Sequence, residues 1–179
     1  VVYTEAFGPA AYIGRARVVP LRNMGAAISP FNSFLILQGI ETLALRMDRI
    51  CDNSLAVAKY LQKHSKVRWV NYAGLPDHPS HALAQKYMGG RASGILTFGI
   101  DGGRAGGARF QDALKLFVRL VNIGDAKSLA CHPASTTHRQ LNPAELEKAG
   151  VSEDMVRLSV GIEHVDDLLA DLEQALAAA

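Results

Sequence analysis

Short apolar segments alternate with helical ones over the last two thirds of this chain, and this alternation restricts the fold more than any other feature. Strands are predicted at residues 67–72 and 94–100, from Val121 onward, and at residues 128–131 and 156–160. Helices are predicted at residues 81–88, 107–119, 143–149 and 164–177. The sequence therefore predicts an α/β domain in which one sheet carries helices largely on one face.

The segment before this domain has a different composition. Glycine and proline interrupt residues 1–27 repeatedly, so we expect an irregular arm that packs against something other than the domain. Ser29 and Pro30 then form a helix start, with serine as the N-cap and proline at the first helical position. The helical composition continues to His64, which is long for one globular helix, so a break is expected between residues 46 and 53.

Charge and cysteine content exclude several classes of protein. The net charge is +2, and the basic and acidic residues are interspersed, so no basic run suggests nucleic acid or a membrane surface. No apolar stretch is long enough to span a bilayer, and no secretory leader pattern precedes the domain. Cys51 and Cys131 make neither a disulfide framework nor a zinc set. A cytoplasmic location is expected.

Arg157 is the residue with the sharpest chemical meaning. In the strand at 156–160, Val156 and Leu158 should point to one face, and Arg157 and Ser159 to the other. A guanidinium on a strand offers a planar fork that suits a carboxylate. The pattern alone favours a solvated arginine on the open face of the sheet, because charged side chains are mostly found at the surface.

Two motifs resemble the cysteine and methionine metabolism family of pyridoxal-phosphate enzymes. Residues 157–163 read RLSVGIE, which fits the family's R-[LI]-S-x-G-[LIV]-E strand. Residues 124–129 read GDAKSL, and HPASTTH follows at residues 132–138. In the family this arginine binds the α-carboxylate of the substrate and the serine matching Ser128 lies beside it. The resemblance thus implies a substrate site at Arg157 and Ser128, covers about 150 residues, and identifies the chain as a member.

Several further expectations come from this resemblance. It implies the C-terminal domain of a fold-type I, aspartate-aminotransferase-like enzyme, with a mainly antiparallel sheet. Residues 1–27 would be an arm or the end of the preceding cofactor-binding domain, residues 28–48 an interdomain helix, and residues 49–179 the domain itself. The partners implied are that cofactor domain, an amino-acid substrate and further copies, commonly four.

Within the family, several positions resemble the O-acetylhomoserine sulfhydrylases, which replace the γ-substituent of their substrate with a thiol. These are Asn122, Lys127 and residues 136–141. Methionine γ-lyases and cystathionine enzymes usually have glutamate where Lys127 stands, and both stay open as alternatives. A non-catalytic α/β binding or assembly module is the alternative of another class.

The lysine that holds the family's cofactor is expected outside this chain. None of the chain's seven lysines lies in the family's S-x-[ST]-K-Y segment, so no catalytic and no cofactor-binding residue is identifiable and the chain alone is expected to be inactive. No metal site is expected either: His78 and His81 have metal-like spacing but no third ligand nearby.

The last helix, predicted at residues 164–177, should carry Asp171 on its solvated face.

Overall fold

The computed structural model describes residues 2–179. The chain divides into two compact units, one ending at Leu43 and one running from Ala44 to Ala179. No side chain of the described part of the first unit is buried within the chain. The second unit contains all five strands and both hydrophobic clusters.

The first unit is helical, so the expectation of an irregular arm was wrong. Its elements are α1 (Val2–Phe7), the 3-10 turn Gly8–Ala10, α2 (Ala11–Ala16), a π-helical stretch Arg17–Leu21, α3 (Arg22–Met24) and α4 (Pro30–Glu41). Gly8 has a φ of +51°, and Pro9 then starts a new turn at a position where the missing N–H costs nothing. These residues redirect helical turns rather than prevent them, and Gly25, with a φ of +66°, ends the series.

The long helical segment breaks at Thr42, earlier than the predicted window of residues 46–53. Ser29 caps α4 as expected, its hydroxyl accepting from the Asn32 amide at 3.1 Å. Thr42 leaves the helical conformation, with φ −103° and ψ 3°, and α5 (Leu43–Leu61) follows. The buried side of α5 runs without interruption through Ile50, Ser54, Val57, Ala58 and Leu61. A break inside that face would have separated residues that pack together, which is why the helix continues there.

The sheet has five strands in the order β1-β2-β5-β4-β3. The strands are β1 (Val67–Asn71), β2 (Ile95–Ile100), β3 (Val118–Arg119), β4 (Leu129–Cys131) and β5 (Met155–Ser159). Every pairing is antiparallel except the parallel pair β3–β4, which confirms the expected α/β class with a mainly antiparallel sheet. The third strand is two residues long and ends before Val121, where it was predicted to begin.

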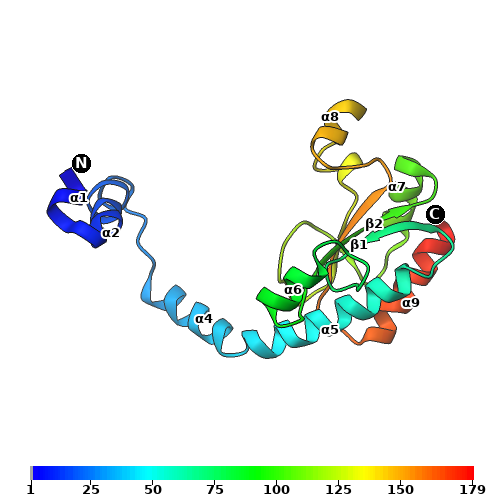
Figure 1. The fold of residues 1–179 in the computed structure, drawn as a ribbon, viewed down its shortest axis with the longest axis horizontal. Helices are drawn as coiled ribbons and strands as arrows, with labels where there is room; N and C mark the ends of the chain where they lie inside the picture. Colours follow the sequence, from blue (N-terminus) through cyan, green and yellow to red (C-terminus); the bar gives the residue numbers. More distant parts are fainter. Residues whose placement is uncertain (1) are drawn as a thin grey trace. The chain divides into compact units, whose positions relative to one another are not determined.

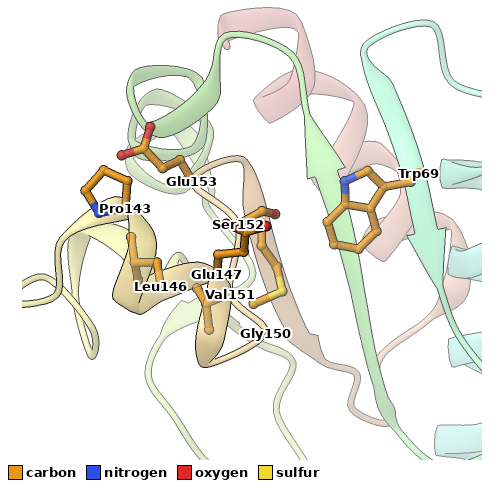
Figure 2. Close-up of a pocket in the computed structure, with 9 residues that line it drawn as sticks. Trp69, Pro143, Leu146, Glu147, Gly150, Val151, Ser152 and Glu153 are labelled. Atoms are coloured by element: carbon orange, nitrogen blue, oxygen red, sulfur yellow. The ribbon is translucent and has the colours of Figure 1, made fainter.

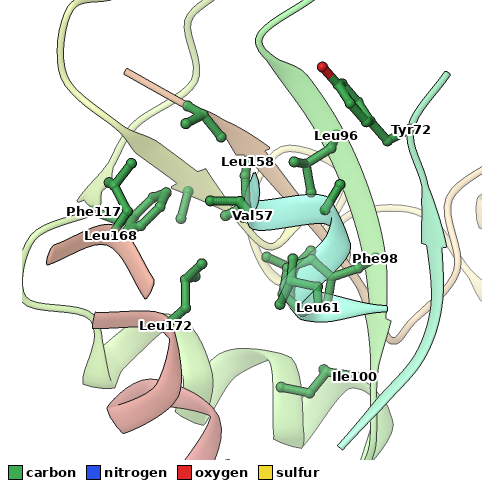
Figure 3. Packing of buried hydrophobic residues seen from close by; sticks show 14 of the residues in the cluster. Val57, Leu61, Tyr72, Leu96, Phe98, Ile100, Phe117, Leu158, Leu168 and Leu172 are labelled. Carbon is green, nitrogen blue, oxygen red and sulfur yellow. The ribbon is translucent and has the colours of Figure 1, made fainter. Parts of the chain in front are cut away.

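Three helices cover one face of the sheet: α5, α7 (Gly103–Ala113) and α9 (Val165–Ala178) (Figure 1). The inward side chains of β2 and β5 pack against them, and Figure 3 shows Leu96, Phe98 and Leu158 in one cluster with Val57 of α5 and Leu172 of α9. Phe98 and Phe110 meet edge to face, with ring centroids 5.6 Å apart. These helices do not cover the opposite face of the sheet. Arg157 lies on that opposite face.

The remaining helices lie between strands. They are α6 (His81–Met88), the 3-10 turn Pro133–Ser135 and α8 (Pro143–Lys148). Asn142 and Glu145 close the N-terminus of α8 with a capping box. None of the helices formed by residues 2–179 combines the length and apolar character that a bilayer crossing requires.

Helix α7 ends at Ala113, six residues before its predicted end, because of a residue expected to be solvated. Asp171 of α9 is only 6% exposed. Its carboxylate accepts the backbone N–H groups of Lys115, Leu116 and Phe117 at 2.8–3.0 Å. These three donors are satisfied by the side chain rather than by a continuing helix, so the chain turns away from α7 toward β3.

Candidate substrate-carboxylate site

Arg157 lies in β5, the central strand of the sheet. Val156, Leu158 and Val160 are fully buried on the helix-covered face, as the alternation predicted. Arg157 points to the other face, where its register partners are Thr97 on β2 and Cys131 on β4. A central strand flanked on both sides gives the base of the arginine side chain a rigid position.

Arg157 is half-buried as a residue, and its guanidinium has no acidic partner within residues 2–179. One of its terminal nitrogens donates to the backbone carbonyl of Asn122 at 3.2 Å. A carbonyl oxygen accepts one hydrogen bond here, whereas a guanidinium has five N–H donors. The group can therefore still take a carboxylate in a bidentate arrangement.

Ser128 is fully buried directly before β4, and both of its donors are already used. Its backbone N–H donates to one carboxylate oxygen of Glu163 at 2.6 Å, and its hydroxyl donates to the other at 2.9 Å. The same hydroxyl oxygen accepts the backbone N–H of Gly161 at 2.8 Å. Ser128 thus ties the segment before β4 to the turn that follows β5.

The segment at residues 122–128 begins at Asn122, whose carbonyl accepts from Arg157, and ends at Ser128. Asp125 folds it by accepting the backbone N–H of Lys127 at 3.0 Å, and this hydrogen bond lowers the pKa of the Asp125 carboxyl. The Lys127 side chain is exposed. The structure therefore brings both predicted site residues to the ends of one short, internally bonded segment.

The histidine loop after β4 has a packing role. His132 is fully buried, and its Nε2 lies 2.9 Å from the carbonyl oxygen of Glu153. Its Nδ1 lies 2.8 Å from the hydroxyl of Ser135. A carbonyl can only accept, so Nε2 carries the proton and Nδ1 accepts from the serine. Cys131 is buried beside it, with its sulfur 3.3 Å from the Thr136 hydroxyl.

The other histidines singled out by their spacing also bond to neighbouring parts of the chain, His78 to the end of β1 and His81, at the start of α6, to the loop before it. His78 Nε2 is 2.7 Å from the side-chain oxygen of Asn71, and His81 Nδ1 is 3.0 Å from the carbonyl of Ala73. No group of three histidine, cysteine or acidic side chains in the described part of the chain could hold a metal ion.

The lysines do not fit a covalent cofactor anchor. Six of the seven are exposed: Lys59, Lys63, Lys86, Lys115, Lys127 and Lys148. Lys66 is half-buried, and its ammonium donates to the backbone carbonyls of Ala177 and Ala179 at 3.2 and 3.0 Å. A lysine that forms a Schiff base needs an amine free of such partners inside an enclosed site.

A hollow of about 440 Å³ lies elsewhere on the domain (Figure 2). Its lining comprises Trp69, Pro143, Leu146, Glu147, Gly150, Val151, Ser152, Glu153 and Met155. Neither Arg157 nor Ser128 belongs to it, and two carboxylates rim it. Like charges would repel a carboxylate ligand there, so this hollow is a poorer candidate for an amino-acid substrate than the surroundings of Arg157.

A sequence model of the Cys/Met metabolism PLP-dependent enzymes matches residues 8–177. The chain belongs to this family. It is 53% identical over 174 residues to O-acetyl-L-homoserine sulfhydrylase 1 of Thermus thermophilus, covering 97% of this chain and 41% of that protein. It is 48% identical over 165 residues to L-methionine gamma-lyase of Pseudomonas deceptionensis, covering 92% of this chain and 41% of that protein. Membership confirms the resemblance seen in the two motifs.

A solved structure from the same family agrees in fold. It is described as a putative O-acetylhomoserine (thiol)-lyase from Campylobacter jejuni, with a pyridoxyl-lysine phosphate at its position 205. The TM-score is 0.86 at 43% identity, over 94% of this chain and 40% of that one. This Cys/Met-metabolism family chain therefore spans about 40% of the length of the relatives it matches.

Sequence reasoning missed the environment of Glu163. The residue closes the RLSVGIE motif, so its position was visible, but no function followed from it. Its partner Ser128 is 35 positions earlier in the chain. A buried serine and a glutamate so far apart carry no pairing signal in one sequence, whereas the folded chain shows the pair at once.

Proposed function

We propose that the full-length protein is a pyridoxal-phosphate-dependent O-acetylhomoserine sulfhydrylase. It would convert O-acetyl-L-homoserine and sulfide, or a thiol, into homocysteine or methionine and acetate. The support is the family membership together with the 53% identity to the Thermus thermophilus enzyme. In this family the cofactor supplies an electron sink for the chemistry at the substrate's α-carbon. The lysines of this chain do not fit its covalent attachment, so its anchor would belong to the rest of the protein.

The task proposed for this chain is to hold the substrate's α-carboxylate. The observation that carries this proposal is the half-buried Arg157 in the central strand, which has no acidic partner among the described residues. A carboxylate from outside would complete its fork and fix the orientation of the bound amino acid. Ser128 would border the same site through the segment that ends at its backbone.

The remaining partners belong to the same proposal. A cofactor domain of the same protein would adjoin this chain, with residues 28–48 as the helix between the domains. The exposed apolar side chains of α4, which include Phe31, Phe34, Leu35 and Ile40, would suit such a covered position. A homotetramer and a cytoplasmic location are proposed as well; the two free cysteines fit a reducing compartment.

A second candidate within the family is methionine γ-lyase activity. The 48% identity to the Pseudomonas deceptionensis enzyme favours it. The two activities differ in the fate of the γ-substituent, which is replaced in one case and eliminated in the other. Incubating the full-length protein with O-acetylhomoserine and sulfide, and separately with methionine alone, distinguishes homocysteine formation from release of methanethiol.

The test of the carboxylate site is steady-state kinetics of Arg157→Ala in the full-length protein. We expect kcat/KM for O-acetylhomoserine to fall by about tenfold or more, because charge-assisted hydrogen bonds contribute roughly 1.5–3 kcal/mol each. Arg157→Lys should recover only part of the loss, since an ammonium cannot form the fork. The matched control is Arg68→Ala, an exposed arginine on the edge strand β1. Unchanged kinetics with a lower melting temperature in Arg157→Ala would make the arginine structural.

A further inference from the structure

We propose that Glu163 is a positioning residue for the carboxylate site. Its side chain would fix the segment at residues 122–128, and through that segment the guanidinium of Arg157. The inference rests on the proposed function of Arg157 as the carboxylate ligand. It assigns to Glu163 a role in substrate recognition although the residue itself would not touch the substrate.

The first step is the pairing of Glu163 with Ser128. Both carboxylate oxygens accept from Ser128, one from the backbone N–H at 2.6 Å and one from the hydroxyl at 2.9 Å. A hydroxyl has a single proton, so the Ser128 hydroxyl has none left to donate to a substrate. Its contribution to the site must therefore come through the position of the chain rather than through a direct hydrogen bond.

The second step is the close packing of the segment on the turn after β5. The Ile162 N–H donates to the Ala126 carbonyl at 3.0 Å. A Cβ atom added to Gly161 would come within 3.0 Å of that carbonyl oxygen and of the backbone carbon of Lys127. The segment and the turn are in direct backbone contact, which only glycine at this position allows. Movement of Glu163 would therefore move the segment with it.

The third step is that side chains of α5 bind the backbone of Glu163. Asn53 is only 2% exposed, and its side-chain amide donates to the carbonyls of Gly161 and Glu163, both at 2.9 Å. Arg49 donates to the same Glu163 carbonyl at 3.3 Å. The backbone of Glu163 is thus anchored to the core helix while its carboxylate reaches over to Ser128. Glu163 is therefore held in place at both its backbone and its side chain.

The last step connects the segment at residues 122–128 to the guanidinium of Arg157. At residue 122 the segment's carbonyl accepts from the Arg157 guanidinium at 3.2 Å, and at residue 128 the segment is held by Glu163. Both contacts fix the same seven residues. Releasing the Glu163 end would let the Asn122 carbonyl shift, and the guanidinium would lose its orienting partner. Small displacements of a binding group are costly where orientation matters.

The experiment compares two inhibitors of the full-length holoenzyme, L-methionine and L-methioninamide, which differ only at the α-carboxyl group. The ratio of their inhibition constants measures recognition of the carboxylate and cancels effects on the rest of the site. We expect Glu163→Ala to reduce the wild-type preference for the acid by about tenfold. Glu163→Gln should reduce it less, because an amide oxygen can still accept the Ser128 N–H. The matched control Glu147→Ala, an exposed glutamate on α8, should leave the ratio unchanged.

A double-mutant cycle with Ser128→Ala tests the pathway. If Ser128 acts through Glu163, the double variant should be no worse than the more severe single variant. An additional loss of acid preference in the double variant would mean that the Ser128 hydroxyl binds the substrate directly, and would overturn the proposed route. Should Glu163→Ala fail to fold, Glu163→Gln and Ser128→Ala decide the question, and an unchanged ratio in both would overturn it.

The outcomes also separate this inference from the function it rests on. If Arg157→Ala abolishes the preference and Glu163→Ala raises both inhibition constants equally, Glu163 is merely structural and only the present inference fails. If Arg157→Ala leaves the ratio unchanged, the proposed carboxylate site itself is wrong. A reduced ratio in both variants, with melting temperatures close to that of the wild type, supports both.

Discussion

At the residue scale, Asp171 shows how one buried carboxylate can decide where a helix ends. It accepts the three successive backbone N–H groups after α7, and the Gln174 side chain adds a fourth hydrogen bond at 2.9 Å. These donors compensate the charge, and no basic side chain among residues 2–179 forms an ion pair with it. The Phe117 N–H is buried and the other two N–H groups are partly buried, so the residue should stabilise the fold well beyond an ordinary surface aspartate.

We expect Asp171→Ala to destabilise the protein by roughly 2–4 kcal/mol, because a buried donor left without a partner costs about 1–3 kcal/mol and the two partly buried donors cost less. Asp171→Asn should cost less, since the amide keeps one acceptor oxygen. The control is Asp167→Ala in the first turn of α9, where loss of an exposed charge should cost less than about 1 kcal/mol. Urea denaturation measures all three, and equal midpoints for Asp171→Ala and Asp167→Ala would contradict the argument.

His132 is the second residue whose burial has a measurable consequence. Removal from solvent lowers its pKa, and the nearby Arg104 guanidinium acts in the same direction, while the Glu153 carbonyl opposes them. The folded protein therefore holds the imidazole neutral at a pH where the unfolded chain already takes up a proton. Its contribution to stability is fully present above the unfolded pKa of about 6.5 and declines as the pH falls below that value.

The prediction is that the protein loses stability between pH 7 and pH 5 more steeply than His132→Gln does. For one proton the slope cannot exceed about 1.4 kcal/mol per pH unit. Thermal melts of both proteins across this range test it, and the difference between them removes the effect of every other titrating group. Parallel curves for the two proteins would show that His132 does not titrate in this window.

At the scale of elements, a contact that depends on one glycine reaches across β2 and joins β1 to the segment directly before β5. The indole N–H of Trp69 donates to the Asp154 carboxylate at 3.2 Å, and the ring lies across Gly99 on the neighbouring strand. A Cβ on Gly99 would come within 3.0 Å of both the indole nitrogen and the carboxylate. The indole can reach Asp154 only because this position has no side chain.

Gly99→Ala should push the indole away from Asp154 and into solvent. Trp69 is the only tryptophan of the 179-residue chain, so its fluorescence reports this site alone. We expect a red-shifted emission maximum and stronger quenching by acrylamide, with a loss of stability of about 1–3 kcal/mol for overpacking. Gly39→Ala, where nothing lies within 4 Å of the added Cβ, is the control. An unshifted spectrum in Gly99→Ala would contradict the close-packing argument.

The sequence was sufficient for the elements that depend on local signals. Strands β1, β2, β4 and β5, and the helices α6, α8 and α9, lie within about two residues of their predicted places. The end of α7 was not predictable, because Asp171, which fixes it, lies more than fifty positions later. The helices of the first unit were missed for a local reason: glycine and proline were taken to prevent helix. Here Pro9 stands at the start of a turn and Gly25 at the end of one, and Pro20 lies within the π-helical stretch.

The site was predictable to a similar degree. Alternation along β5 placed Arg157 on the correct face, and the family motifs singled out Ser128. The sequence could not show that the Ser128 hydroxyl is committed to Glu163 and Gly161, since that depends on contacts across more than thirty positions. Its roles in substrate binding and in positioning stay predictions.

At the scale of the whole molecule, stability should reside in the unit from Ala44 to Ala179. Both hydrophobic clusters come from this unit alone, and none of the described residues before Ile50 is buried. We expect a truncated protein beginning at Ala44 to unfold cooperatively, with a melting temperature within a few degrees of that of the 179-residue chain. It should also be the more soluble form, because the exposed apolar side chains of α4 are removed. Loss of a cooperative transition would show that the first unit is needed for folding.

The strand order has a consequence for how the domain is made. The middle strand of the sheet, β5, is the last of the five to be synthesised. Until it emerges from the ribosome, the β1–β2 pair and the β3–β4 pair have no partner between them and expose unpaired edges. The nascent chain therefore passes through a stage that is open to wrong pairing, in which chaperones would protect it. The strand that carries Arg157 is also the one whose arrival completes the sheet.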